Sequence, residues 1–209
     1  MVRTKRHLWI AVACLALTAS PVAAQKRSAG AAVVLVPGAA GAVPNDFLIR
    51  NQEGFARAGL TTAVATSAGQ AASAASSFAA QGFAVTLVGM SAGTPSVAEA
   101  LAAGAPASRV VFVAGTLMPG TAQRSVVAAL GTPERLPPTL VVHNRNDDCR
   151  LTPPEAVPEF IRWSGGRARV RWISSGAGPG PPCGAMSAHG FFGNDGPAVA
   201  AIASFARGR

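Results

Sequence analysis

Residues 85–94 read VTLVGMSAGT, a short apolar run followed by a glycine, a serine and a second glycine. The run has the length and composition of a buried strand, and the segment SVAEALAAG at 96–104 has the composition of a helix. Between a strand and a helix, a G-x-S-x-G sequence holds its serine on a tight turn with the hydroxyl above the sheet. The stretch therefore predicts that Ser91 is a nucleophile. The alternative is a structural turn in which Ser91 only caps the helix.

Strands and helices alternate along the rest of the chain. Apolar runs predict strands at 31–36, 61–66, 83–89, 109–115, 139–143 and 167–173, and helices are expected at 46–59, 71–81, 96–104, 153–163 and 196–207. Strands that are apolar on both faces and alternate with helices are typical of a parallel sheet covered on two sides. We expect a single-domain α/β fold with about six mainly parallel strands, whose carboxyl ends share the edge at which ligand sites form.

The first 24 residues have the pattern of an export signal. A basic start is followed by a short apolar segment and then by small residues before Gln25. We expect a signal peptide at 1–24 and one mature domain at 25–209, exported to the periplasm or secreted. The alternative is a lipoprotein acylated at Cys14, although the usual leucine three places ahead of this cysteine is missing.

Removal of three basic residues with the signal lowers the formal charge of the chain from +9 to +6. The remaining positive charge is mostly scattered arginine, and the alternation of Arg167, Arg169 and Arg171 is typical of a solvated strand at the edge of a sheet. Without aromatic residues among the arginines, the pattern argues against a nucleic-acid partner. No second long apolar segment follows the signal, so we expect no membrane span in the mature chain. The sequence does not predict the oligomeric state.

A nucleophilic serine needs a histidine base, and the base needs an acid that fixes its tautomer. His189 lies in a loop between the last predicted strand and the last predicted helix, which suits a base. His143 closes a strand, where a histidine usually packs or bonds locally. The acid should follow a strand between the serine and the histidine, and Asp147 and Asp148 both stand there.

The chain order Ser91, Asp147, His189 resembles the nucleophile, acid and base of the α/β hydrolase superfamily, and the resemblance covers essentially the whole mature chain. More narrowly, the chain resembles small exported bacterial α/β hydrolases of the esterase and dienelactone-hydrolase type, which carry H-x-R-x-D-x-C after a strand and a late C…HG-F-x-G stretch. The matching residues are His143, Arg145, Asp147, Cys149 and Pro153, followed by Cys183, His189, Gly190, Phe191 and Gly193. This match implies that Asp147 rather than Asp148 is the acid, and that a serine hydrolase of this type needs no cofactor.

The segment LVPGAAGAVPN departs from the superfamily, because it stands where an HGGG-type motif is usual. An oxyanion hole needs backbone N–H groups rather than particular side chains, so we expect Ala92 to supply one donor and Ala39 or its neighbour the other. Residues 115–137 are too few for a lid domain. The pocket should therefore be open or only lightly covered, which favours a compact acyl group and argues against large lipid droplets.

Cys149 and Cys183 form an even pair once the signal has left, and in an oxidising compartment a disulfide is favoured over two free thiols. The bond would tie the loop of the predicted acid to the loop of the predicted base. Zinc is a poor alternative and no metal is expected, because the two cysteines and two histidines lack the usual close ligand pairs.

Three hypotheses for function follow. The first is an exported serine hydrolase that cleaves a small-molecule carboxylic ester through an acyl-enzyme, although the residues do not select an ester over a thioester or an amide. The second is an α/β-hydrolase scaffold retained as a non-catalytic envelope or binding protein, since fold does not determine function. The third is an acyltransferase, in which an alcohol replaces water.

Overall fold

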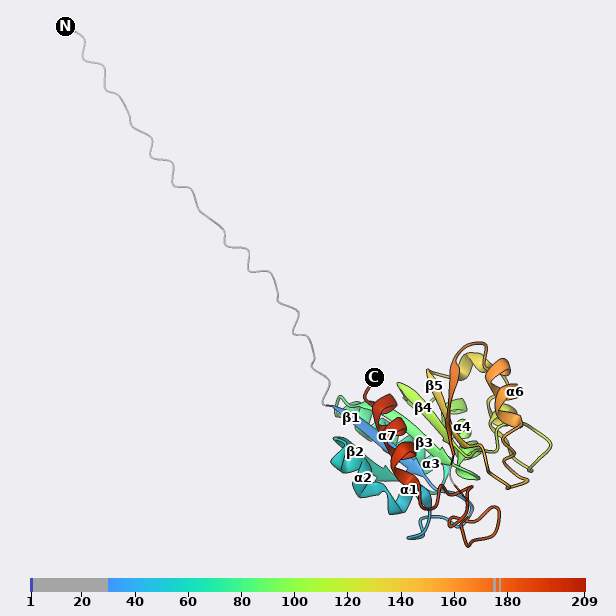
Figure 1. The fold of residues 1–209 in the computed structure, drawn as a ribbon. Helices are drawn as coiled ribbons and strands as arrows, with labels where there is room; N and C mark the ends of the chain where they lie inside the picture. Colours follow the sequence, from blue (N-terminus) through green and yellow to red (C-terminus); the bar gives the residue numbers. More distant parts are fainter. Residues whose placement is uncertain (2–29, 175, 177) are drawn as a thin grey trace.

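The computed structural model describes residues 1, 30–174, 176 and 178–209, so the predicted signal peptide, apart from Met1, lies outside the described residues. The described chain forms one sheet of six parallel strands with helices on both faces (Figure 1), as the sequence predicts. The strands are β1 Ala31–Val36, β2 Leu60–Val64, β3 Ala84–Met90, β4 Arg109–Val113, β5 Thr139–Asn144 and β6 Ala168–Ile173. Their order in the sheet is β2-β1-β3-β4-β5-β6, which leaves β2 and β6 as its edges.

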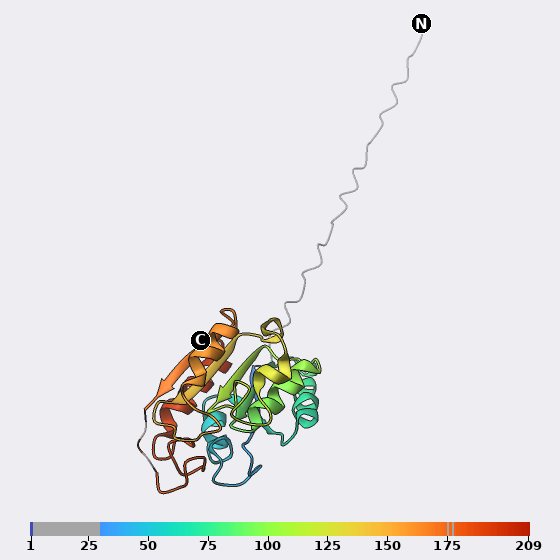
Figure 2. The same cartoon turned by 90° about the vertical axis from the view of Figure 1, so that its right-hand side faces the viewer.

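Helices cover both faces of the sheet (Figures 1 and 2). One face carries α1 Phe47–Arg50, α2 Gln52–Arg57 and α7 Asp195–Ala206. The other face carries α3 Ala68–Ala80, α4 Gly93–Ala102, α5 Val126–Leu130 and α6 Ala156–Trp163, and a short 3-10 helix, η1, spans Pro133–Arg135. Among the described residues, no helix combines the length and apolar character needed to cross a bilayer.

The strands are apolar on both faces because each face packs under its own layer of helices. In β1, Val33 and Leu35 belong to the core beneath α1, α2 and α7, whereas Val34 and Val36 belong to the core beneath α3 and α4. All four side chains are at most 1% exposed. This double burial accounts for the near-continuous apolar runs in the sequence.

The helix expected at 46–59 is divided in the structure. Asp46 caps α1 by accepting a hydrogen bond from the N–H of Leu48 at 2.8 Å. Asn51 separates α1 from α2, and its side-chain amide donates to the Phe47 carbonyl at 2.9 Å and to Asp195 at 3.0 Å. The helix expected at 153–163 forms as α6, with Pro158 in its first turn, where a proline costs no internal hydrogen bond.

The carboxyl ends of the parallel strands lie at one edge of the sheet. The loops that follow β1, β3, β5 and β6 therefore meet there, and they carry Ala39, Ser91, Asp147 and His189 respectively. Open α/β sheets assemble ligand sites at this edge. The fold thus brings together residues that are widely separated in the sequence.

Candidate active site

The turn between β3 and α4 holds Ser91 in a conformation that few residues adopt. Its φ is 49°, in the left-handed region that non-glycine residues rarely occupy. Both flanking glycines are required by close packing: a Cβ on Gly89 would lie 2.9 Å from the Gly93 carbonyl oxygen, and a Cβ on Gly93 would lie 2.3 Å from the Val36 carbonyl oxygen. The G-M-S-A-G sequence therefore forms a tight turn packed against the end of β1.

Hydrogen bonds hold this turn in place. The N–H of Ser91 donates to the Val113 carbonyl at 2.9 Å, which continues the pairing of β3 with β4 up to the serine. The hydroxyl of Thr94 donates to the Ser91 carbonyl at 2.7 Å, and Thr94 Oγ1 accepts from the N–H of Thr116 at 3.1 Å. Both the N–H and the carbonyl of Ser91 are thus hydrogen-bonded, and its side chain is half-buried.

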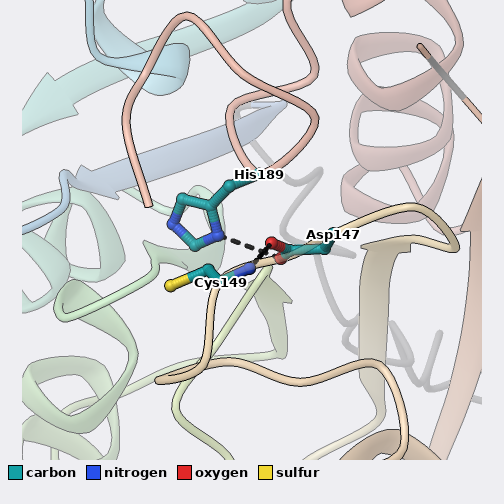
Figure 3. A group of neighbouring side chains, drawn as sticks. All are labelled: Asp147, Cys149 and His189. Carbon is teal, nitrogen blue, oxygen red and sulfur yellow. Dashed lines mark hydrogen bonds and ion pairs between the residues drawn. The ribbon is translucent and has the colours of Figure 1, made fainter. Parts of the chain in front are cut away.

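His189 and Asp147 meet at the carboxyl ends of β5 and β6. Nδ1 of His189 lies 2.9 Å from Oδ2 of Asp147, and both side chains are almost fully buried (Figure 3). The second ring nitrogen of His189 points away from the carboxylate (Figure 3). A carboxylate at Nδ1 favours the tautomer that carries its proton there, which leaves Nε2 free to accept a proton.

Two further side chains face the same carboxylate oxygen. Thr152 Oγ1 lies 3.3 Å from Asp147 Oδ2 and 3.1 Å from His189 Nδ1, so it touches both partners. Nε2 of His143 lies 3.3 Å from Asp147 Oδ2, a contact that falls short of a well-aligned hydrogen bond. His143 has no exposed surface and packs edge-on against Trp172. It thus packs locally, as expected for a strand end, and also contacts the predicted acid.

The surroundings of Asp147 favour its charged form. Burial opposes ionisation, but the contacts from His143 and His189, together with the N–H of Cys149 at 2.9 Å, hold the pKa of Asp147 at about 2, below its ordinary value of 3.8. Asp147 is therefore a carboxylate throughout the neutral range. Asp148 is exposed.

A cleft of about 430 Å³ opens at this edge of the sheet. Both Ser91 and His189 line it. No hydrogen bond joins these two side chains in the described part of the chain. Catalytic contacts are often long before a substrate binds. The other lining residues are mainly apolar and include Val43, Phe47, Met90, Pro95 and Leu151.

The loop after β1 forms one wall of the cleft, and Asp46 fixes its shape. Oδ2 of Asp46 accepts a hydrogen bond from the N–H of Gly38 at 2.9 Å, which removes that amide as a donor to a ligand. Ala39 and Ala92 both line the cleft, and across the described residues their N–H groups donate to no protein acceptor. The two predicted oxyanion donors are thus on the walls of one cleft.

Arg124 brings a positive charge to the cleft, but the charge is neutralised. Its guanidinium pairs with both carboxylate oxygens of Glu99, at 2.9 and 2.6 Å, and also donates to Ser96 Oγ at 3.2 Å. Among the described residues that line the cleft, no arginine is therefore left unpaired for an anionic substrate.

Cys149 and Cys183 form the predicted disulfide. The bond links the loop after β5, which carries Asp147, to the loop after β6, which carries His189. Cys183 itself lines the cleft. The cross-link therefore lies at the wall of the site.

Asp147, Cys149 and His189 place one potential metal-ligand atom each within 4.8 Å of one another (Figure 3). The chemistry of this set does not suit a metal ion. The sulfur of Cys149 is bonded to Cys183 and is no thiolate, and Nδ1 of His189 is already bonded to Asp147.

The sequence did not point to several polar residues in and around the site, among them Thr152, Asp46 and Arg50. Thr152 lies five residues after Asp147 in a loop and gives no pattern of its own. Asp46 could have been found, because an aspartate directly before a helix is a common cap. Arg50 donates hydrogen bonds to the carbonyls of Ala185 and Gly190, on either side of His189, and nothing in its local sequence indicates this.

Similar solved structures were found, whereas no family model and no curated protein matches the sequence. An esterase from Exiguobacterium antarcticum is 13% identical, with a TM-score of 0.57 over 86% of this chain and 92% of that one. An alpha-beta serine hydrolase homologue from Coxiella burnetii is 15% identical, with a TM-score of 0.58 over 84% of this chain and 82% of that one. A dienelactone hydrolase-like promiscuous phosphotriesterase from metagenomic libraries is 18% identical, with a TM-score of 0.56 over 84% of this chain and 85% of that one. The chain therefore has the α/β-hydrolase fold.

Proposed function

We propose that the protein is an exported serine hydrolase that cleaves carboxylic esters with a small or compact acyl group. The observation that carries this proposal is the arrangement of Ser91 and His189. Ser91 stands on a strained turn in a cleft that His189 also lines, and the far side of the imidazole is bonded to a buried carboxylate.

In the proposed reaction, Ser91 Oγ attacks the ester carbonyl while Nε2 of His189 takes the hydroxyl proton. Asp147 orients the imidazole and stabilises its positive charge. The N–H groups of Ala92 and Ala39 bind the oxyanion. The tetrahedral intermediate collapses as His189 gives its proton to the leaving alcohol. Water then attacks the acyl-enzyme by the same steps, with His189 as base, and releases the carboxylic acid.

The cleft supports a compact, neutral substrate. Its volume is about 430 Å³, its walls are mainly apolar, and its arginine is paired with Glu99. Buried apolar surface would supply most of the binding energy for such a substrate. The esterase from Exiguobacterium antarcticum among the structural neighbours supports this class of reaction.

Two features support export. The first 24 residues have the pattern of a signal peptide. The disulfide between Cys149 and Cys183 suits an oxidising compartment, because cytosolic thiols are kept reduced.

A fluorophosphonate probe, which reacts with activated serines, tests the proposal. We expect the wild type to be labelled, Ser91→Ala to be unlabelled, and the control Ser76→Ala, which changes an exposed serine on α3, to be labelled at the wild-type rate. Hydrolysis of p-nitrophenyl esters of increasing chain length should fall as the acyl group outgrows the cleft. A folded wild type that neither reacts with the probe nor hydrolyses any ester would instead support the non-catalytic binding protein.

A further inference from the structure

Arg50, the last residue of α1, uses every donor of its guanidinium. Nε and Nη2 donate to the two carboxylate oxygens of Asp195 at 2.8 and 2.7 Å. The remaining N–H groups donate to the carbonyls of Asn45 at 2.6 Å, Ala185 at 3.2 Å and Gly190 at 2.5 Å. A guanidinium has only five such donors, so none is left for a substrate.

The three carbonyls belong to two loops that border the cleft. Asn45 ends the loop after β1, which also contains Ala39. Ala185 and Gly190 lie on either side of His189 in residues 184–193, the segment called here the base loop. An added Cβ on Gly190 would lie 2.0 Å from the Ala185 carbonyl oxygen, so these two residues are already tightly packed. One side chain thus joins the base loop to the loop after β1.

The base loop also has an apolar anchor on α1. Phe191 is fully buried with a φ of 57°, and its ring centroid lies 5.1 Å from that of Phe47. This contact packs the loop against α1. The charge-assisted, two-pronged pairing of Arg50 with Asp195 is directional, because it requires a particular orientation of both groups.

We propose that Arg50 is a positioning residue, which holds the base loop so that His189 faces Ser91. The proposal rests on the proposed function, because it concerns the same reaction. Proton transfer needs the imidazole within about 3 Å of the hydroxyl. A displacement of about 1 Å can lower the rate about a hundredfold. Since Arg50 has no donor free for the substrate, its loss should lower kcat and leave KM nearly unchanged.

A lysine cannot replace Arg50 in this role. Its ammonium group is a point charge with three donors and lacks the planar fork that spans Asp195 and the three carbonyls. Arg50→Lys should therefore keep the ion pair with Asp195 but lose the bonds to Ala185 and Gly190. This variant separates a general stabilising charge from the positioning of the base loop.

The test compares kcat and KM for p-nitrophenyl acetate in Arg50→Ala, Arg50→Lys and a control, Arg135→Ala. Arg135 also donates to a backbone carbonyl, that of Leu130 at 3.0 Å, but does not line the cleft. We expect kcat to fall about ten- to a hundredfold in Arg50→Ala. In Arg50→Lys, kcat should also be lowered, although the thermal stability is that of the wild type. The control Arg135→Ala should keep the wild-type kcat. Wild-type kcat in both Arg50 variants, or a loss confined to KM, would overturn the proposal.

Amide hydrogen exchange over residues 184–193 gives a readout that does not need activity. We expect faster exchange in Arg50→Ala than in the wild type and in Arg135→Ala. Unchanged exchange would overturn the anchoring role even in an active enzyme. If the wild type reacts with no fluorophosphonate and hydrolyses no ester, the proposed function fails, whereas faster exchange in Arg50→Ala would still show that this residue holds the loop.

Discussion

Nδ1 of His189 lies 2.9 Å from Oδ2 of Asp147, although the two residues are 42 positions apart in the chain. If this pair serves catalysis, Asp147→Asn should lower kcat by about 10³ to 10⁴, because an amide cannot hold the imidazole in the required tautomer. The exposed neighbour makes a matched control, and Asp148→Asn should retain wild-type kcat. Steady-state kinetics of the two variants decides whether Asp147 or Asp148 is the acid. A larger loss of kcat in Asp148→Asn than in Asp147→Asn would assign the role to Asp148.

The charge of Asp147 should make the fold sensitive to acid. Its pKa is about 2 in the folded protein and should approach the ordinary 3.8 in the unfolded chain. As the pH falls, the unfolded chain takes up this proton first, so the stability contributed by Asp147 is fully present above about pH 4 and is lost as the pH falls towards 2. The difference between the two pKa values corresponds to about 2 kcal/mol.

Urea unfolding at a series of pH values checks this effect. Because the side chain of Asp147→Asn does not ionise, that variant should lose less stability than the wild type between pH 4 and pH 2. Removing the contact from His143, as in His143→Leu, should raise the folded-state pKa of Asp147 towards 3.8, so that less stability is lost below pH 4 and the loss ends at a higher pH. Parallel curves for the wild type and Asp147→Asn would contradict the assignment.

Reduction of the disulfide should lower stability and activity together. Cys149 and Cys183 are 34 positions apart, and closing a loop of this length stabilises a fold by about 4 kcal/mol in the chain-entropy model. Activity should fall because the bond restrains the loops of Asp147 and His189 relative to each other. A melting temperature and an ester-hydrolysis rate that are both unchanged by a dithiol reductant, or in the double variant Cys149→Ser and Cys183→Ser, would refute this role.

The tight turn at Ser91 should not tolerate a side chain at Gly93. In Gly93→Ala the new Cβ would meet the Val36 carbonyl oxygen at 2.3 Å, so β1 or the turn must move, at a cost of at least about 2 kcal/mol in the free energy of unfolding. Fluorophosphonate labelling should fall as well, because Ser91 moves with the turn. Gly69 on α3 has open space around it, and Gly69→Ala should be neutral or stabilising by up to about 1 kcal/mol. Equal melting temperatures for the two variants would count against the turn geometry.

The sheet could be predicted from the sequence because its strands carry a local signal. The run at 31–36 coincides with β1, and the parallel arrangement follows from strands that are apolar on both faces. The break at Asn51 could not be predicted, because its side chain bonds to Asp195, which is 144 positions away. α5 was also missed, since it has five residues and buries only two of them.

In the site, too, the residues with a local sequence signal could be predicted, and those defined by distant contacts could not. Ser91, Asp147 and His189 follow strands in a familiar order, so the sequence points to them, although their catalytic roles stay predictions. Thr152 and Arg50 act through partners 37 and up to 145 positions away. Only folding reveals these contacts, because neither residue belongs to a short pattern with a chemical meaning.

The arginines of β6 also affect the tendency of identical molecules to associate through their sheet edges. β6 is an edge strand, and both Arg169 and Arg171 are exposed along it. An open strand edge can template the addition of another chain, and clustered positive charge makes that addition unfavourable between identical molecules. The two arginines thus oppose the pairing of the exposed β6 edge with the edge of another copy, which would otherwise lead to β-aggregates.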